Sequence, residues 1–370
     1  MQKDKILIVG SFQKPGKQKI FGGIAKSCDE ILNSKSFYEF DIFTIDSTSL
    51  SVPPPNYLIR LIFASKRIIE LILKLSFKKP ACCLFFCSDG SSAIEKGLMI
   101  LISKFFGIKC LIFPRAGNLI NQVKQNHLFK FFIKNLFKKA DKFLCQGENW
   151  KKFAIEILKI NNSKLEVVPN WTATRDLLKV GIDRKINSKK ELQLIYVGWL
   201  IKEKGISELL KSFRDIISKN YKVKLLIIGD GQYATEINRF IIKNNLDDLI
   251  NISGWLNSKD LLKAYKQSDI FILPSWQEGM PNALIEALAT GLPSISTSVG
   301  VIKNYFIDKN HILIVPPKNE NKLTKAIEKL ILDVNFRVKL SKNGFNQVKE
   351  VFNSNKGLSN LSIIIKNTIN

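Results

Sequence analysis

Short apolar runs that end near glycine or proline alternate along the chain with longer segments of helical periodicity. The runs at 6–10, 192–197 and 223–228 have the length of strands, and each is followed by a polar loop and a helical pattern. Strands that alternate with helices in this way form parallel sheets with helices on both faces. The sequence therefore predicts an α/β protein with doubly wound parallel sheets.

The chain is too long for one hydrophobic core. At 370 residues, with 45% apolar residues, it predicts two domains of this kind. Residues 172–190 are polar and charged, and we expect them to form the linker between the domains.

Residues 269–300 contain the pattern strand, loop, helix, strand. The run 270–273 is a buried strand, and Pro281 begins a helix that ends near residue 290. Glu278 lies in the loop and Glu286 in the helix, and Gly279 allows a tight turn between them. The two carboxylates can then approach one ligand at the helix N-terminus from two sides. The alternative is structural, with Glu278 capping the helix and Glu286 solvated on its surface.

This stretch resembles the Glu-x7-Glu motif of retaining glycosyltransferases of family 4 (group 1). The match includes Leu-Pro-Ser before the motif and Glu-Gly-x-Pro-x-x-x-x-Glu-Ala across it. It is specific at 269–300, fair at 140–148 and 192–231, and weak before residue 130.

The resemblance implies the GT-B fold, in which two Rossmann-like domains face a cleft. Residues 1–180 are then an acceptor-binding, membrane-facing domain and residues 190–352 a nucleotide-sugar-binding domain. Residues 353–370 are expected to form a helix that crosses back to the first domain.

The resemblance also assigns roles to individual residues. Glu278 is expected beside the donor sugar, and Lys204, in Gly198-Trp-Leu-Ile-Lys-Glu-Lys204-Gly, beside the pyrophosphate. Glu286 is expected to accept hydrogen bonds from the ribose hydroxyls. The predicted donor-binding residues are Gly22, Gly23, Gly198, Lys202, Gly229, Gly231, Gly279, Met280, Pro281 and Glu286.

The chain departs from the family pattern at several positions. Trp199 stands where the family has an arginine, which removes a bidentate phosphate donor, and Lys202 is a candidate to compensate. The N-domain histidine of many family members is missing, and Arg115 is our candidate for its role among the catalytic residues. We expect His127 and His311 to be structural.

The sequence predicts no cofactor and no metal. It lacks an Asp-x-Asp motif, which argues against a metal-bridged donor, and its cysteines and histidines lack zinc spacing. Lys204 and helix N-termini would then neutralise the departing pyrophosphate, as in metal-independent GT-B enzymes.

Basic residues are concentrated in the first half. The formal net charge is +25, and residues 57–142 contain 16 basic and four acidic residues. The segments 57–79 and 127–139 are amphipathic and basic, which favours either binding to an anionic membrane surface or packing of an ordinary surface helix. No common nucleic-acid-binding module is present, so we expect no nucleic-acid partner.

The resemblance implies a retaining, hexosyltransferase-type enzyme, and the basic first half adds the expectation that it is cytoplasmic and peripheral on the inner face of the membrane. It would use a UDP- or GDP-sugar and a saccharide or polyprenyl-linked acceptor in surface polysaccharide biosynthesis. Six cysteines in the first half, several within apolar runs, are expected to be reduced, buried thiols. Two alternatives remain, a non-catalytic nucleotide-binding protein of the same fold on a membrane surface and a nucleotide-sugar epimerase.

Overall fold

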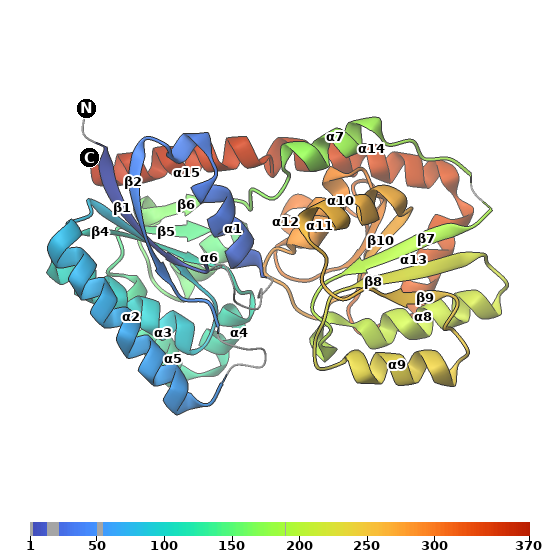
Figure 1. The fold of residues 1–370 in the computed structure, drawn as a ribbon, viewed down its shortest axis with the longest axis horizontal. Coiled ribbons are helices and arrows are strands. Elements are labelled where there is room, and N and C mark those ends of the chain that lie inside the picture. Colours follow the sequence, from blue (N-terminus) through green and yellow to red (C-terminus); the bar gives the residue numbers. More distant parts are fainter. Residues whose placement is uncertain (1–2, 13–21, 50–54, 189) are drawn as a thin grey trace. The chain divides into compact units, whose positions relative to one another are not determined.

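The computed structural model describes residues 3–12, 22–49, 55–188 and 190–370. The chain forms two compact units (Figure 1), unit 1 with residues 1–171 and 354–370 and unit 2 with residues 172–353. Each unit contains a six-stranded sheet whose strands pair in parallel, with helices on its faces. The predicted fold class, two doubly wound parallel-sheet domains, is confirmed.

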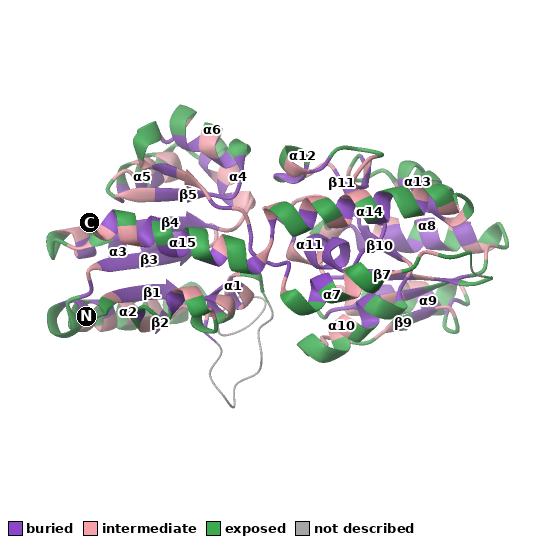
Figure 2. Cartoon of the chain, turned by 90° about the horizontal axis from the view of Figure 1, so that it is seen from above, coloured by how far each residue is buried: buried purple, intermediate pink, exposed green. Residues whose placement is uncertain are grey.

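The sheet of unit 1 has the strand order β2-β1-β3-β4-β5-β6. The central strands are buried along most of their length because helices cover both faces (Figure 2). The strands are β1 (Asp4–Gly10), β2 (Phe40–Asp46), β3 (Cys82–Cys87), β4 (Lys109–Pro114), β5 (Lys142–Cys145) and β6 (Leu165–Val167). The helices are α1 (Gly23–Leu32), α2 (Tyr57–Lys78), α3 (Ser91–Phe105), α4 (Asn118–Gln125), α5 (His127–Phe137), α6 (Glu148–Glu156) and α15 (Ser354–Ile369).

The sheet of unit 2 has the order β12-β11-β10-β7-β8-β9, so β10, β7 and β8 are neighbours. The strands are β7 (Leu192–Val197), β8 (Val223–Ile228), β9 (Ile250–Ile252), β10 (Ile270–Leu273), β11 (Ser294–Thr297) and β12 (Leu313–Val315). The helices are α7 (Arg175–Asp183), α8 (Ile206–Ser218), α9 (Ala234–Lys243), α10 (Ser258–Gln267), α11 (Asn282–Ala289), α12 (Ile302–Tyr305), α13 (Glu320–Leu332) and α14 (Val334–Val351).

The expectation that residues 172–190 form a linker was wrong. They contain helix α7, which buries Leu177 and Leu178 and belongs to unit 2. Arg184, just after the helix, donates to the carbonyl oxygens of Ser268 at 2.9 Å and Tyr265 at 2.6 Å. These hydrogen bonds hold the segment against unit 2, and its polar composition hid the helical periodicity.

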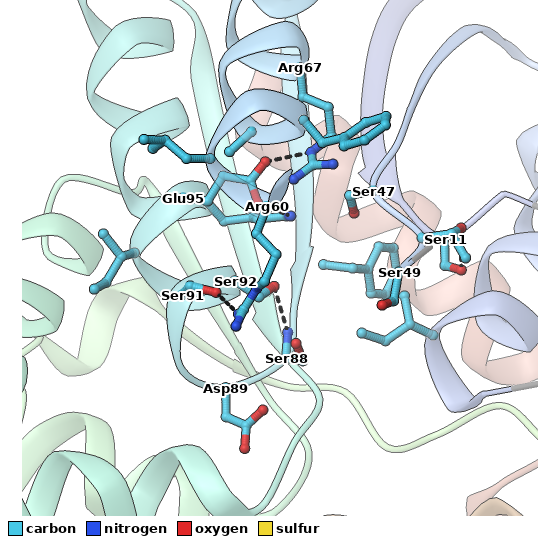
Figure 3. A pocket seen from close by; sticks show the side chains of 18 of the residues that line it. Ser11, Ser47, Ser49, Arg60, Arg67, Ser88, Asp89, Ser91, Ser92 and Glu95 are labelled. Atoms are coloured by element: carbon cyan, nitrogen blue, oxygen red, sulfur yellow. Dashed lines mark hydrogen bonds and ion pairs between the residues drawn. The ribbon is translucent and has the colours of Figure 1, made fainter. Parts of the chain in front are cut away.

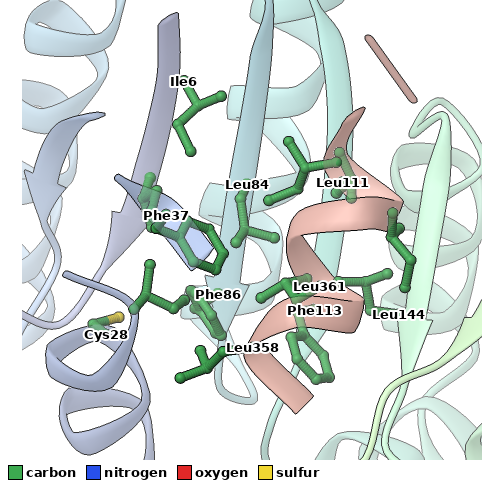
Figure 4. Packing of buried hydrophobic residues seen from close by; sticks show 14 of the residues in the cluster. Ile6, Cys28, Phe37, Leu84, Phe86, Leu111, Phe113, Leu144, Leu358 and Leu361 are labelled. Carbon is green, nitrogen blue, oxygen red and sulfur yellow. The ribbon is translucent and has the colours of Figure 1, made fainter. Parts of the chain in front are cut away.

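The last helix of the chain packs into the core of unit 1. Leu358 and Leu361 of α15 lie in one buried cluster with Phe86 of β3 and Phe113 of β4 (Figure 4). Trp171 belongs to the same cluster, with its ring 5.9 Å from that of Phe113. The final 17 residues therefore complete the hydrophobic core of the N-terminal sheet.

All six cysteines are free and buried, which confirms that prediction. Burial raises the pKa of Cys28, Cys83, Cys87 and Cys145 to about 12, so these groups are neutral thiols at neutral pH.

Helix α2 has an unusually exposed apolar face. Only Leu71 and Leu75 are fully buried, whereas Leu61, Leu73 and Phe77 are among its exposed apolar side chains. The sequence predicted an apolar face opposite the charged one, and the structure shows that much of this face is uncovered. None of the helices that the structure describes has the length and apolar composition needed to cross a bilayer.

We predict that Leu361→Ala lowers the free energy of unfolding by about 2–5 kcal/mol, because it opens a cavity beside Phe86 and Phe113. Ile363→Ala on the same helix is the matched control, since that side chain is 51% exposed, and it should change the value by less than about 0.5 kcal/mol. Urea denaturation measures both, and equal effects would contradict the packing described for α15.

Candidate active site

Most of the predicted donor-site residues lie at one edge of the unit 2 sheet. Gly198 follows β7, Gly229 follows β8, and Glu278 lies in the loop after β10. These three strands are neighbours and run parallel, so the loops at their carboxyl ends lie together. Ligands of open α/β sheets bind beyond this edge.

The structure joins Lys204 to Glu278. Lys204 Nζ donates to Glu278 Oε1 at 2.6 Å, and Ser275 Oγ donates to the same oxygen at 2.7 Å. Both charged side chains are partly exposed. Burial, followed by the charge of Glu278, raises the pKa of the neighbouring Tyr196 phenol, which donates to the carbonyl of Trp199. A cation and an oriented carboxylate are therefore held at the sheet edge, where a ligand has access to them.

Gly205 allows this contact to form. It has a φ of +69°, and a Cβ there would lie 2.1 Å from the carbonyl oxygen of Pro274. The loop that carries Lys204 therefore packs directly against the end of β10, which leads to Glu278. An L-residue at this position would be both strained and crowded.

The glycines after β8 permit a second close approach. Gly229 and Gly231 both have positive φ, and a Cβ on them would lie 1.8 Å from the oxygen of Gly198 and 2.4 Å from that of Leu200. The loop after β8 therefore packs backbone to backbone on the loop after β7, with Leu200 N donating to Asp230 O at 2.9 Å. The structure thus gives Gly229 and Gly231 a packing role.

Glu286 lies deeper than Glu278. It is buried on α11 and accepts a hydrogen bond from the Tyr265 hydroxyl at 2.9 Å. Burial and the charge of Glu286 raise the pKa of Tyr265. Helix α11 follows Pro281, its N-cap makes no side-chain hydrogen bond, and its amino end carries partial positive charge.

The residues around this motif differ in their exposure and in the contacts they already make. Met280 is buried, and the carbonyl of Gly279 accepts a hydrogen bond from Val301 N at 3.1 Å. Lys202 is exposed, and no described contact joins it to Glu278. Trp199 packs edge to face against Trp255, with ring centroids 5.0 Å apart.

Three contacts of the site were not predicted from the sequence. Ser275 belongs to the Leu-Pro-Ser motif but had no assigned role, and it orients Glu278. Tyr265 supports Glu286 from α10, and no local pattern marked it. Trp276 Nε1 donates to Glu208 at 3.0 Å, which fixes the loop before Glu278.

The remaining predicted residues belong to unit 1. Arg115 follows β4, donates to Ser27 Oγ at 2.9 Å, and lies 4.8 Å from the ring of Phe113 and 5.3 Å from that of Trp171. Burial lowers the pKa of Arg115 to about 10, so the side chain remains a cation at neutral pH. Its Nη1 is buried without an acceptor among the described residues.

Of the other predicted residues of unit 1, Gly22 is the N-cap of α1 and Gly23 is its first residue. The Gly23 carbonyl accepts a hydrogen bond at 2.9 Å from Ser27 Oγ, the same group that accepts from Arg115. His127 begins α5 on the surface, and His311 accepts a hydrogen bond from Ile307 N in unit 2.

Comparison with known proteins identifies the family. Residues 181–347 match the family model of glycosyl transferases group 1, and this range covers the sheet edge described above. Residues 181–347 therefore belong to this family. The chain is a glycosyltransferase, and the recognition made from the motif at 269–300 is confirmed.

Relatives of this glycosyltransferase occur in bacterial surface-polymer synthesis. It is 28% identical over 307 residues to the capsular polysaccharide biosynthesis glycosyltransferase CapM of Staphylococcus aureus, covering 78% of this chain and 77% of the relative. It is 27% identical over 274 residues to the UDP-Gal:alpha-D-GlcNAc-diphosphoundecaprenol alpha-1,3-galactosyltransferase of Escherichia coli, covering 68% and 69%. The structure of sucrose-phosphate synthase from Thermosynechococcus elongatus matches with a TM-score of 0.77 at 16% identity, covering 99% of both chains.

The arrangement in this glycosyltransferase suits an anionic leaving group. Family members generally use nucleotide-sugar donors, whose departing diphosphate carries growing negative charge. Lys204 supplies a cation, and the amino end of α11, with its partial positive charge, lies at the same edge of the sheet. Glu278 offers a carboxylate that can accept hydrogen bonds or stabilise positive charge on a sugar.

We predict that Gly205→Ala destabilises the protein by about 3 kcal/mol, because left-handed strain adds to the contact with Pro274 O. Gly254→Ala is the control: its φ is +68°, yet nothing lies within 4 Å of a new Cβ. That variant should lose about 1–2 kcal/mol of stability, from the backbone strain alone. If urea denaturation gives equal losses, the close approach at Gly205 is not required.

Proposed function

We propose that this enzyme is a retaining glycosyltransferase that moves a hexose from a UDP- or GDP-sugar to a lipid-linked saccharide in surface polysaccharide biosynthesis. The observation that carries the proposal is the contact between Lys204 and Glu278 at the sheet edge. It places a cation for the diphosphate beside a carboxylate for the sugar within the sequence motif of the family.

The reaction breaks the bond between the anomeric carbon and the diphosphate oxygen, and the nucleotide diphosphate departs with that electron pair. A bond forms from the anomeric carbon to an acceptor hydroxyl oxygen, and the proton of that hydroxyl passes to the departing diphosphate. Lys204 and the amino end of α11 would stabilise the departing diphosphate without a metal. Glu278 would stabilise the positively charged sugar, and Glu286, oriented by Tyr265, would bind the ribose.

The choice of substrates is supported by the relatives. The Escherichia coli enzyme is named for a UDP-galactose donor and a diphosphoundecaprenol-linked acceptor, and the Staphylococcus aureus relative for capsular polysaccharide. Arg115, a partly buried cation at the carboxyl end of β4, is proposed to serve the acceptor in unit 1.

Turnover of a UDP- and GDP-sugar panel with a lipid-linked acceptor extract tests the proposal. Lys204→Ala and Glu278→Gln should each lower kcat by roughly 10²–10³-fold, because each removes a charge that stabilises the transition state. Lys222→Ala, an exposed lysine directly before β8 and therefore at the opposite edge of the sheet, should leave kcat within about twofold.

Three outcomes would contradict the proposal. Thermal stabilisation by UDP without turnover would favour a non-catalytic binding protein, and conversion of the donor without acceptor would favour an epimerase. Activity that disappears in EDTA and returns with a divalent cation would refute metal independence.

The surface of unit 1 supports attachment to an anionic membrane as a peripheral protein of the cytoplasmic face. Helix α3 packs between α2 and α5, and all three carry exposed apolar side chains. On α5 these are Leu128, Phe131 and Phe132, while Ile133 and Leu136 are buried. The 16 basic and four acidic residues of 57–142 give this surface charge complementarity to anionic lipid.

We predict that replacing Lys130, Lys134 and Lys138 with Gln weakens binding to anionic liposomes on the order of a hundredfold, at about 1 kcal/mol per lysine. The double variant Leu128→Ser, Phe131→Ser should weaken it further at high salt, where apolar insertion dominates. The matched control replaces Lys259, Lys263 and Lys266 of α10 in unit 2. Equal losses in the two lysine sets, measured by co-sedimentation, would refute a specific membrane face.

A further inference from the structure

A cavity of about 710 Å³ lies between helices α2 and α3 of unit 1 (Figure 3). At one end it reaches residues that follow the first three strands, Ser11 after β1, Ser47 after β2 and Ser88 after β3. Its size is within the range of small-molecule sites, about 300–1,000 Å³. No described contact of the donor site involves these residues.

Two helices begin at the polar end of this cavity. Residues from the first turns of α1 and α3 line it, including Gly23 and Ser91. Their N-caps, Gly22 and Gly90, provide no side-chain hydrogen bond. The first amides of a helix lack acceptors within the helix and carry partial positive charge. The amino ends of α1 and α3 therefore both favour an anion at this end of the cavity.

Arg60 adds a full positive charge at the same place. Figure 3 shows it extending from α2 toward Ser91, to whose Oγ it donates. Among the residues that the structure describes, no carboxylate forms an ion pair with Arg60. Asp89 also lines the cavity, but it accepts a hydrogen bond from Asn118 at 2.8 Å. Arg60 is thus held in place by a neutral partner, which leaves its charge available to a ligand.

The second arginine of the cavity already has an ion-pair partner. Arg67 donates to Glu95 at 2.6 Å, and the buried Lys96 donates to the other oxygen of Glu95 at 3.1 Å. Burial alone would raise the pKa of Glu95, but Lys96 and Arg67 hold it below its ordinary value. This ion-paired group supports the wall between α2 and α3, whereas Arg60 is the cation offered to an anion.

The rest of the lining is largely apolar. It includes one side of α2 and the facing residues of α3: Leu58, Leu61, Ala64, Ile68, Ile94 and Leu98. Leu58, Leu61 and Leu98 are also exposed at the surface, so the apolar lining is continuous with the outer face of α2 and α3. A ligand that matches the whole cavity has an anionic group at one end and a hydrocarbon chain that continues to the surface.

We propose that this cavity binds the isoprenoid phosphate or diphosphate part of the acceptor. The phosphate contacts Arg60 and the amino ends of α1 and α3, and the first isoprene units lie between α2 and α3. The remainder of a long chain stays in the bilayer at the exposed apolar face. This assignment rests on the proposed function, in which the acceptor is lipid-linked.

The test is calorimetric titration of the full-length protein with farnesyl diphosphate, inorganic pyrophosphate and farnesol. We expect farnesyl diphosphate to bind at least tenfold more tightly than either of the others, because both parts of the cavity contribute. Arg60→Ala should weaken farnesyl diphosphate binding at least tenfold. Lys66→Ala, which removes one exposed charge from the same helix outside the cavity lining, should change it by less than twofold.

A second variant separates the two ends of the cavity. Ala64→Phe fills the apolar part and should weaken farnesyl diphosphate while leaving pyrophosphate binding unchanged. Equal effects of Arg60→Ala and Lys66→Ala, or pyrophosphate binding as tight as that of farnesyl diphosphate, would overturn the proposal. Thermal stabilisation by UDP, measured on every variant, reports on the donor site separately. If farnesyl diphosphate binding fails these tests while UDP stabilisation and turnover persist, the cavity assignment is wrong and the proposed function still stands.

Discussion

The close packing of glycine loops at the carboxyl edge of the unit 2 sheet is the constraint on which the site depends. Neighbouring parallel strands deliver their loops to one edge, but side chains would hold those loops apart. Gly205 and Gly229 remove this obstacle, since their backbones approach Pro274 and Gly198 directly. Lys204 and Glu278, 74 positions apart in the chain, can therefore meet at 2.6 Å. The Lys204–Glu278 ion pair thus depends on glycines, whose lack of a Cβ atom lets the loops pack closely.

Much of the fold was predictable because its signals are local. The strands at 192–197, 223–228 and 270–273 have the bounds expected from their apolar runs, and the motif at 269–300 identified the family. The segment 172–190 was misjudged because Leu177 and Leu178, the buried residues of its helix, are two adjacent positions that show no helical repeat, and the flanking residues are charged. Its attachment depends on Arg184 reaching backbone carbonyls more than 80 positions away, which no local pattern encodes.

The candidate site was predictable in its motif residues but not in their supports. Glu278 and Lys204 stood out because their motifs resemble those of the family. Ser275 contacts Glu278 three residues away in the same loop, and Tyr265 reaches Glu286 through a tertiary contact. The same limit applied to α2, where periodicity predicted an apolar face but could not tell whether another element covers it. Burial is a property of the assembled fold, so residues whose roles depend on it are found only in three dimensions.

Helix α15 completes a core whose parts are translated far apart in time. Phe86 and Phe113 are translated before unit 2, whereas Leu358 and Leu361, which cover them, are translated after it. Unit 2 has its whole sequence available before that moment, because it ends at residue 353. Part of the core of unit 1 therefore stays uncovered while unit 2 can already fold. Unit 2 can thus complete its fold before unit 1, although most of unit 1 is translated first.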